Sequence, residues 1–61
     1  MTVRTYTTAE KRQEALREIA MRKRVYPRWV EAGRMKQEHA DHNIAVMEAI
    51  AEDYKEPELF K

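Results

Sequence analysis

Apolar positions recur every three or four residues along two stretches of the chain, and this spacing predicts two amphipathic α-helices. The first stretch covers residues 8–32 and the second covers residues 37–55. Thr7 and Glu10 have the spacing of a capping box, in which a hydroxyl and a carboxylate satisfy free amides at a helix start. Gly33, the only glycine, follows the first stretch directly, at a position where helices commonly end in a left-handed residue. We therefore expect a helix, a turn and a second helix.

The connection between these helices is short, and short helix–helix connections favour antiparallel neighbours. Pro27 lies inside the first helix, where it removes an amide donor and clashes with the preceding turn. We expect a continuous helix that kinks at this residue. Lys36 is a poor N-cap for the second helix. The expected fold is an all-α antiparallel helical hairpin with a proline-kinked first helix, forming a single small domain.

Two terminal segments lie outside the helical pattern. Residues 1–6 are expected to form a flexible arm. Residues 56–61 form a tail in which Leu59 and Phe60 follow polar residues. We expect this Leu-Phe pair either to fold back on the helices or to dock on another protein.

Each predicted helix carries an apolar stripe that would form the internal seam of the hairpin. In the first helix this stripe comprises Leu16, Ile19, Ala20, Tyr26, Pro27 and Val30. In the second helix it comprises Ala40, Ile44, Met47, Ile50, Ala51 and Tyr54, widened by Val46.

The first helix has a second apolar patch on its other side, formed by Met21, Val25, Trp29 and Ala32. One neighbouring helix cannot cover both sides, and exposed patches that contain Trp and Met commonly mark interfaces. The alternative is that the kink turns Trp29 into the seam. We expect a partner-binding surface at Met21, Arg22, Arg24, Val25, Arg28 and Trp29. A homodimer that pairs two hairpins into a four-helix bundle would cover the patch.

Size and composition also favour association and argue against catalysis. The chain has 61 residues and no cysteine, so it has no disulfide and no thiolate zinc site. A chain this short buries only about 60% of its unfolded surface, and oligomerisation is one remedy. It also lacks serine, and a hairpin has nowhere to enclose a substrate. We expect no enzyme activity and no small-molecule ligand.

Two histidines are the only candidates for a metal site. His39 and His42 stand beside Glu38 and Asp41, and imidazole with carboxylate can bind zinc. The spacing does not match a metalloprotease motif, and further ligands would be needed. We expect solvated side chains and neither a metal nor another cofactor. No apolar run reaches the length of a membrane helix or signal peptide, so we expect no membrane contact.

Charge divides the chain into a basic front and an acidic back. Residues 1–36 hold ten basic and four acidic residues, whereas residues 37–61 hold two basic and seven acidic residues. This asymmetry favours pairing of the two helices. It also leaves a candidate basic surface for phosphate or an acidic protein, formed by Arg22, Lys23 and Arg24 with Arg28, Arg34 and Lys36. Nucleic-acid association through this basic face is therefore the alternative function, although the acidic second helix would repel a polyanion.

One block of sequence resembles a known group of proteins. The block comprises Val25-Tyr26-Pro27-Arg28-Trp29-Val30, Gly33-Arg34-Met35, Ala40-Asp41, Ile44, Met47-Glu48-Ala49-Ile50 and Asp53-Tyr54. It is similar to short proteins encoded by bacteriophages and prophages, which have no agreed activity. The resemblance implies context, a phage accessory protein that acts in the bacterial cytoplasm. With the apolar patch, we expect a protein that acts by protein–protein interaction, inhibiting or modulating a host enzyme or defence complex. The resemblance carries over no catalytic or binding residue.

Overall fold

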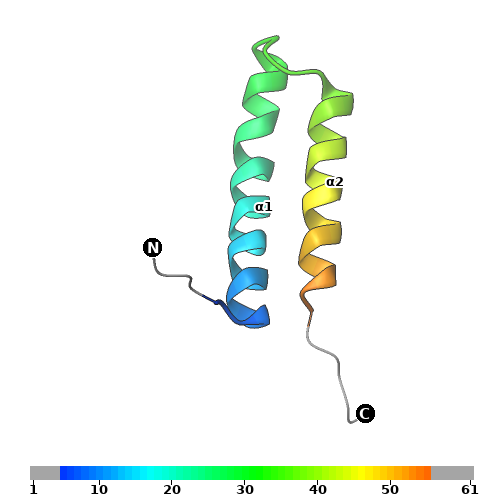
Figure 1. Ribbon diagram of the computed structural model, residues 1–61. Helices are drawn as coiled ribbons and strands as arrows, with labels where there is room; N and C mark the ends of the chain where they lie inside the picture. Colours follow the sequence, from blue (N-terminus) through cyan, green and yellow to red (C-terminus); the bar gives the residue numbers. More distant parts are fainter. Residues whose placement is uncertain (1–4, 56–61) are drawn as a thin grey trace, which may run out of the picture.

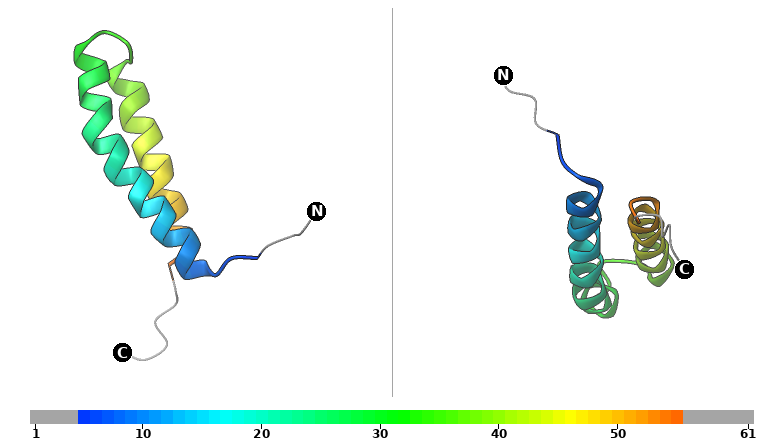
Figure 2. Two further views of the ribbon diagram at one scale, coloured as in Figure 1. Left: turned by 90° about the vertical axis from the view of Figure 1, so that its left-hand side faces the viewer. Right: turned by 90° about the horizontal axis from the view of Figure 1, so that it is seen from below.

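Two antiparallel helices make up the fold of this protein (Figure 1). The computed structural model describes residues 5–55, and within this range it contains α1 (Thr8–Glu31) and α2 (Gln37–Asp53) but no strand. The all-α helical hairpin is therefore confirmed. The expected terminal positions 1–4 of the arm and the whole tail, including Leu59 and Phe60, lie outside the described residues. Figure 2 shows that the two helices form a single layer, so each helix has one neighbour.

The start of α1 is held by the capping box that the sequence predicts. The backbone N–H of Glu10 donates to the Thr7 hydroxyl at 3.0 Å, and the backbone N–H of Thr7 donates to the Glu10 carboxylate at 2.9 Å. The hydrogen bond from the Thr7 backbone, helped by the Thr7 side chain, lowers the pKa of Glu10 from its ordinary value. The carboxylate also lies where the partial positive charge of the helix start favours an anion.

Pro27 lies within α1, and the helix continues on both sides of it to Glu31. The predicted continuity across the proline is therefore correct. Proline has no N–H, so the carbonyl of Lys23 loses its usual donor one turn earlier. The kink at Pro27 stays a prediction.

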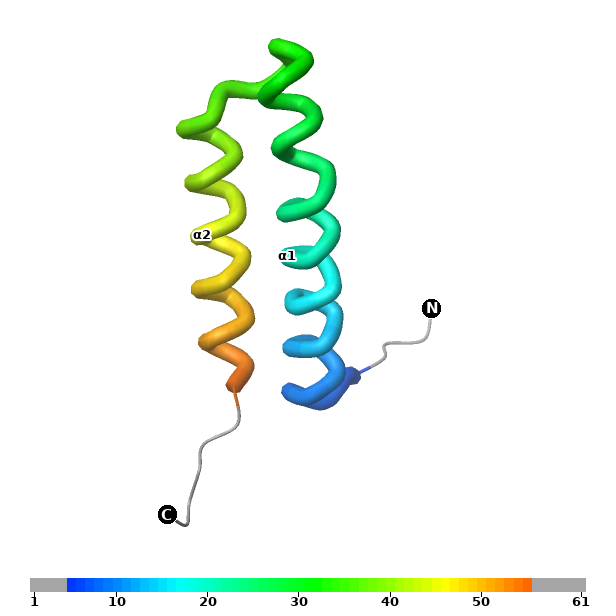
Figure 3. Tube along the Cα trace, turned by 180° about the vertical axis from the view of Figure 1, so that it is seen from behind, coloured from blue at the N-terminus to red at the C-terminus, as the bar shows by residue number. Residues whose placement is uncertain are grey.

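The chain reverses through a tight turn between Glu31 and Gln37, seen from behind in Figure 3. The amide of Arg34 donates to the Trp29 carbonyl at 2.8 Å, and the amide of Gly33 donates to the Val30 carbonyl at 3.0 Å. These two bonds form a Schellman motif. Gly33 has φ +77°, a left-handed conformation that glycine adopts without steric cost. Lys36 begins α2 without a side-chain cap, as its residue type predicts.

Small side chains dominate the interface between the helices. The buried residues of the described chain are Ala15, Ile19, Tyr26, Ala40 and Ala51. Ala15, Ile19 and Ala51 form one cluster, and Met47 packs against it. Alanine on both helices lets the backbones lie close together, but it contributes little apolar area. The core of the hairpin is therefore narrow.

The predicted seam on α1 is partly wrong. Leu16 is 42% exposed, and Ala20 and Pro27 are exposed, whereas Ile19 and Tyr26 are buried and Val30 is half-buried. The buried line of α1 runs through the buried residues 15, 19 and 26 and includes the half-buried Arg22, at alternating steps of four and three. Because Arg22 is charged, a prediction based on apolar residues alone does not find this line and selects Leu16 instead.

The seam on α2 is also narrower than predicted. Ala40 and Ala51 are buried, and Ile44, Met47 and Tyr54 are half-buried. Val46 is 44% exposed and Ile50 is 37% exposed, so these two residues do not belong to the seam. They lie too far around the helix from Ala40 and Ala51 to reach α1.

The contrast between Ile19 and Leu16 gives a test of the seam. Ile19→Ala removes a side chain from the buried cluster and should cost about 2 kcal/mol or more. Leu16→Ala changes a side chain of similar size on the exposed flank and should cost well under 1 kcal/mol. Thermal unfolding followed by circular dichroism measures both. Equal losses in the two variants would contradict the seam described here.

The cap at the start of α1 should respond to pH. The pKa of Glu10 is lower in the folded protein than its ordinary 4.5, so the cap stabilises the helix above that pH. The stabilisation should disappear as the pH falls through the folded pKa. Glu10→Gln removes the charge, so wild type should be more stable than this variant at pH 6 and approach it near pH 3. Urea unfolding at several pH values measures the difference, and a pH-independent difference would exclude this role.

Candidate protein-interaction face

Two contacts between the helices define the two sides of the hairpin. Arg22 Nη1 donates to the backbone carbonyl of Asn43 at 2.9 Å. Lys23 Nζ forms an ion pair with Glu48 Oε2 at 3.1 Å. Neighbouring residues of a helix point about 100° apart. Because Arg22 lies at one edge of the buried line of α1 and Lys23 lies beyond its other edge, the two contacts lie on opposite sides of the seam.

Large apolar side chains gather on the side marked by Arg22 and Asn43. On α1, Val25 and Trp29 follow Arg22 by three and seven residues. On α2, Val46 and Ile50 follow Asn43 by the same two steps. Residues at these spacings share one face of a helix. The two helices therefore contribute to one surface, which we call the tryptophan face and define as Met21, Val25, Trp29, Val46 and Ile50.

The side chains of the tryptophan face are open to solvent to differing degrees. Trp29 is 41% exposed, and its ring lies 5.6 Å from that of Tyr26 at an angle of 31°. Val46 and Ile50 have similar exposure, and Met21 and Val25 are half-buried. The alternative in which Trp29 turns into the core is therefore wrong. The indole leans on the edge of the seam and keeps much of its surface free.

Arg22 lies between the seam and the tryptophan face, and its side chain is fully engaged within the hairpin. Its Nε donates to Glu18 Oε2 at 2.8 Å, and its guanidinium carbon lies 5.9 Å from the Tyr26 ring centre. The bond to the Asn43 carbonyl completes the set, and the side chain is 24% exposed. Arg22 therefore clamps α1 to α2, a role that its predicted place in the partner-binding surface does not include.

The other two arginines predicted for the partner-binding surface lie on the surface of the hairpin. Arg24 and Arg28 are exposed, and neither forms an ion pair within residues 5–55. Ala32, predicted to extend the patch, is exposed and serves as the C-cap of α1. The structure thus brings Met21, Val25 and Trp29 to one side, with Arg24 and Arg28 as the available cations nearby.

Charge differs sharply between the helices. Within Thr8–Glu31 there are seven Lys or Arg residues and four acidic residues. Within Gln37–Asp53 there are five acidic residues and no Lys or Arg. The ion pair of Lys23 with Glu48 is one place where the two helices use this difference. The charge asymmetry of the sequence therefore corresponds to two helices of opposite sign.

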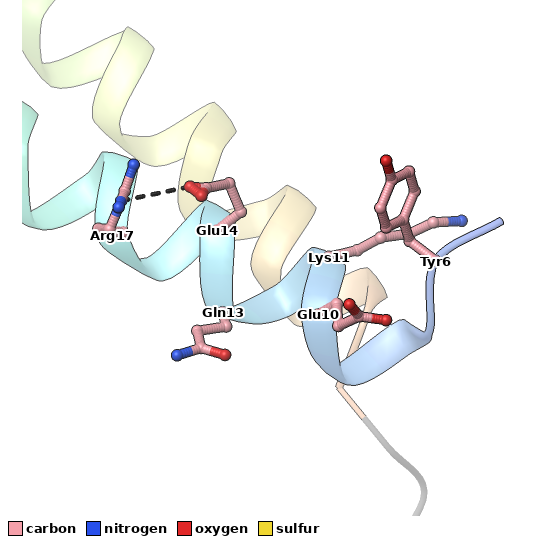
Figure 4. Close-up of a pocket in the computed structure, with 6 residues that line it drawn as sticks. All are labelled: Tyr6, Glu10, Lys11, Gln13, Glu14 and Arg17. Atoms are coloured by element: carbon pink, nitrogen blue, oxygen red, sulfur yellow. Dashed lines mark ion pairs between the residues drawn. The ribbon is translucent and has the colours of Figure 1, made fainter. Parts of the chain in front are cut away.

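The hollows of the described surface are open and shallow. One, of about 500 Å³, lies along the start of α1 and is lined by Tyr6, Glu10, Lys11, Gln13, Glu14 and Arg17 (Figure 4). There Arg17 pairs with Glu14 at 3.2 Å. Another, of about 700 Å³, lies at the turn and is lined by Trp29, Gly33, Arg34, Met35, Lys36, His39 and Asn43. The second hollow borders the tryptophan face and extends it toward the turn.

The histidines do not form a metal centre in the described part of the chain. His39 and His42 are exposed, and no group of three or more His, Cys, Asp or Glu side chains between residues 5 and 55 is placed to hold a metal ion. Neither of the two helices described is long and apolar enough to cross a membrane.

Two members of the tryptophan face, Val46 and Ile50, are not predicted from the sequence. Apolar spacing places them in the seam, because spacing alone does not distinguish a buried stripe from an exposed flank. The signal that separates them is the line of Ala40, Met47, Ala51 and Tyr54, which leaves Val46 and Ile50 on the same flank as Asn43.

Comparison with protein-family models, with curated proteins and with solved structures gives no match to this chain.

The clamp formed by Arg22 can be tested against a neighbouring arginine. Arg22→Gln loses the bonds to Glu18 and Asn43 and should destabilise the hairpin by about 1–2 kcal/mol. Arg24→Gln removes an exposed cation with no ion pair in the described range and should change stability by less than about 0.5 kcal/mol. Chemical denaturation measures both free energies. Equal unfolding free energies for the two variants would contradict a clamp at Arg22.

Proposed function

We propose that this chain is a small phage-type accessory protein that acts by binding another protein through the tryptophan face. The observation that supports this most directly is that Trp29, Val46 and Ile50 lie on one side of the hairpin, where each is between 37% and 44% exposed. A lone exposed apolar residue is ordinary, but several on one surface are typical of interfaces. Tryptophan in particular contributes strongly to binding energy.

The target class follows from the same surface and from the sequence resemblance. We propose a protein of the bacterial cytoplasm, either a host enzyme or a defence complex, that the chain inhibits or modulates. Arg24 and Arg28 stand beside the apolar side chains and would favour an acidic rim on the target. A catalytic role has little support, because the two hollows described above are open to solvent, whereas ligand pockets usually enclose most of a substrate.

Nucleic-acid association has weaker support. Its candidate cations are Arg22, Lys23 and Arg24, with Arg28, Arg34 and Lys36. Of these six, Arg22 donates to the Asn43 carbonyl and Lys23 pairs with Glu48. The neighbouring helix α2 has no basic residue apart from its two histidines and carries five acidic ones. A phosphate backbone near α1 would meet this negative charge as well.

The decisive variant is Trp29→Ala, with Leu16→Ala as its matched control. Leu16 is 42% exposed on the side marked by the Lys23–Glu48 pair, so both variants remove a similarly exposed apolar side chain. Tagged wild type, Trp29→Ala and Leu16→Ala are used to capture proteins from a bacterial lysate, which mass spectrometry quantifies. Wild type and Leu16→Ala should retain the same target, and Trp29→Ala should retain at least tenfold less, as an interface anchor does.

Retention of the target by Trp29→Ala would rule out the tryptophan face as its binding site. Recovery of nucleic acid in place of a specific protein, lost at moderate salt, would favour the alternative function. Circular dichroism of each variant establishes that the helices remain formed.

A further inference from the structure

We infer that the tryptophan face is occupied by a second copy of this chain. In the resulting four-helix bundle, α1 of one copy lies against α2 of its partner, and both turns lie at the same end. The inference goes beyond the proposed function. A second copy and a target protein would use the same face, so a target would bind there in exchange for the second copy.

The first argument is the narrow core of one hairpin. Three of its five buried residues are alanine, and no large side chain in the described range is fully buried. Small domains without disulfides or metals need additional burial from some source, and oligomerisation is a common one. A second hairpin would give each helix two neighbours in place of one, as in four-helix bundles.

The second argument is the shape of the exposed surface. The tryptophan face takes side chains from both helices, so its natural complement is another surface two helices wide. The contacts of Arg22 with Asn43 and of Lys23 with Glu48 show which parts of the antiparallel helices lie level with each other. Met21 therefore lies near the level of Val46. In a symmetric dimer that preserves this register along the helices, Met21 of each copy lies opposite Val46 of the other.

The polar groups between these apolar side chains do not oppose burial. Arg22 already has partners in Glu18 and the Asn43 carbonyl, so its hydrogen bonds are made within one copy. Covering a paired charge costs far less than covering an unpaired one. The second copy would need to satisfy few new polar groups.

Charge selects between the two ways of placing the hairpins face to face. A two-fold axis parallel to the helices sets α1 against α2 of the partner and puts both turns at one end. A two-fold axis across the helices sets α1 against α1 and α2 against α2, with the turns at opposite ends. Because α2 has five acidic residues and no Lys or Arg, the second arrangement opposes like charges. The first arrangement sets basic α1 against acidic α2 twice.

The oligomeric state is tested by sedimentation equilibrium of the full chain over a range of concentrations. The expected mass is twice that of the 7.3 kDa chain. The double variant Val46→Gln, Ile50→Gln should weaken the dimer at least tenfold, whereas Leu16→Gln, at an equally exposed site on the other flank, should not. A mass of one chain up to the millimolar range, or dissociation caused by Leu16→Gln alone, would overturn the inference.

The arrangement is tested on otherwise wild-type protein, so the result does not depend on the folding of the double variant. The chain has no cysteine, and Arg34→Cys in the turn therefore accepts a single spin label per copy. With both turns at one end, the labels should lie within about 25 Å of each other, given interaxial distances near 10 Å. With the turns at opposite ends, the distance should exceed about 35 Å, because a 24-residue helix is about 36 Å long. Such a long distance would overturn the proposed arrangement.

Failure of this inference can be told apart from failure of the proposed function. A strictly monomeric chain that loses a specific lysate protein on Trp29→Ala would overturn the second copy and leave the proposed function intact. A dimer with the expected label distance whose Trp29→Ala variant captures the lysate protein as well as wild type would support the second copy and contradict target binding at this face.

Discussion

Each helix of this hairpin has one neighbour, and most other features of the molecule follow from that constraint. A helix with a single neighbour can bury only one narrow stripe of its surface. Here the stripe consists largely of alanine, with Ile19 and Tyr26 as its bulky members. Other large apolar residues of α1 and α2, such as Leu16, Trp29 and Val46, are therefore exposed, and the orientation of the seam around each helix decides on which side they lie.

Arg22 links the seam to the exposed surface. It occupies a position in the buried line, where an apolar residue would add to the core, and instead spans to the backbone of α2. Its bond to Glu18 keeps the guanidinium in place, and its stacking on Tyr26 places charge beside the most bulky part of the core. The result is a polar strip between two apolar flanks. Such a strip fixes the relative position of the helices, and it divides a surface that would otherwise be a continuous apolar patch.

The sequence predicts the helices well because their signals are local. The Thr7–Glu10 capping box and Gly33 mark the ends of α1 through short-range chemistry, and both act as expected in the structure. The identity of the seam depends on which residues tolerate a neighbouring helix, and this is not a local property. Arg22 joins the seam although it is charged, and Leu16 and Val46 leave it although they are apolar. The spacing of apolar residues along the chain cannot reveal that Arg22 belongs to the seam or that Leu16 and Val46 do not.

The candidate surface was predictable in part for the same reason. Met21, Val25 and Trp29 stand out on α1 because they oppose the rest of its apolar residues. Val46 and Ile50 join them only when the register of the two helices is known, since no spacing along the chain relates one helix to the other. The cross-helix contacts of Arg22 and Lys23 supply that register.

The turn has a consequence for the indole that this surface presents. The carbonyl of Trp29 accepts the amide of Arg34, so the residue that carries the indole also anchors the reversal of the chain. Lengthening or shortening the link between the helices would therefore re-aim the aromatic ring as well as alter the loop. The orientation of the ring and the geometry of the turn therefore depend on the same backbone hydrogen bond.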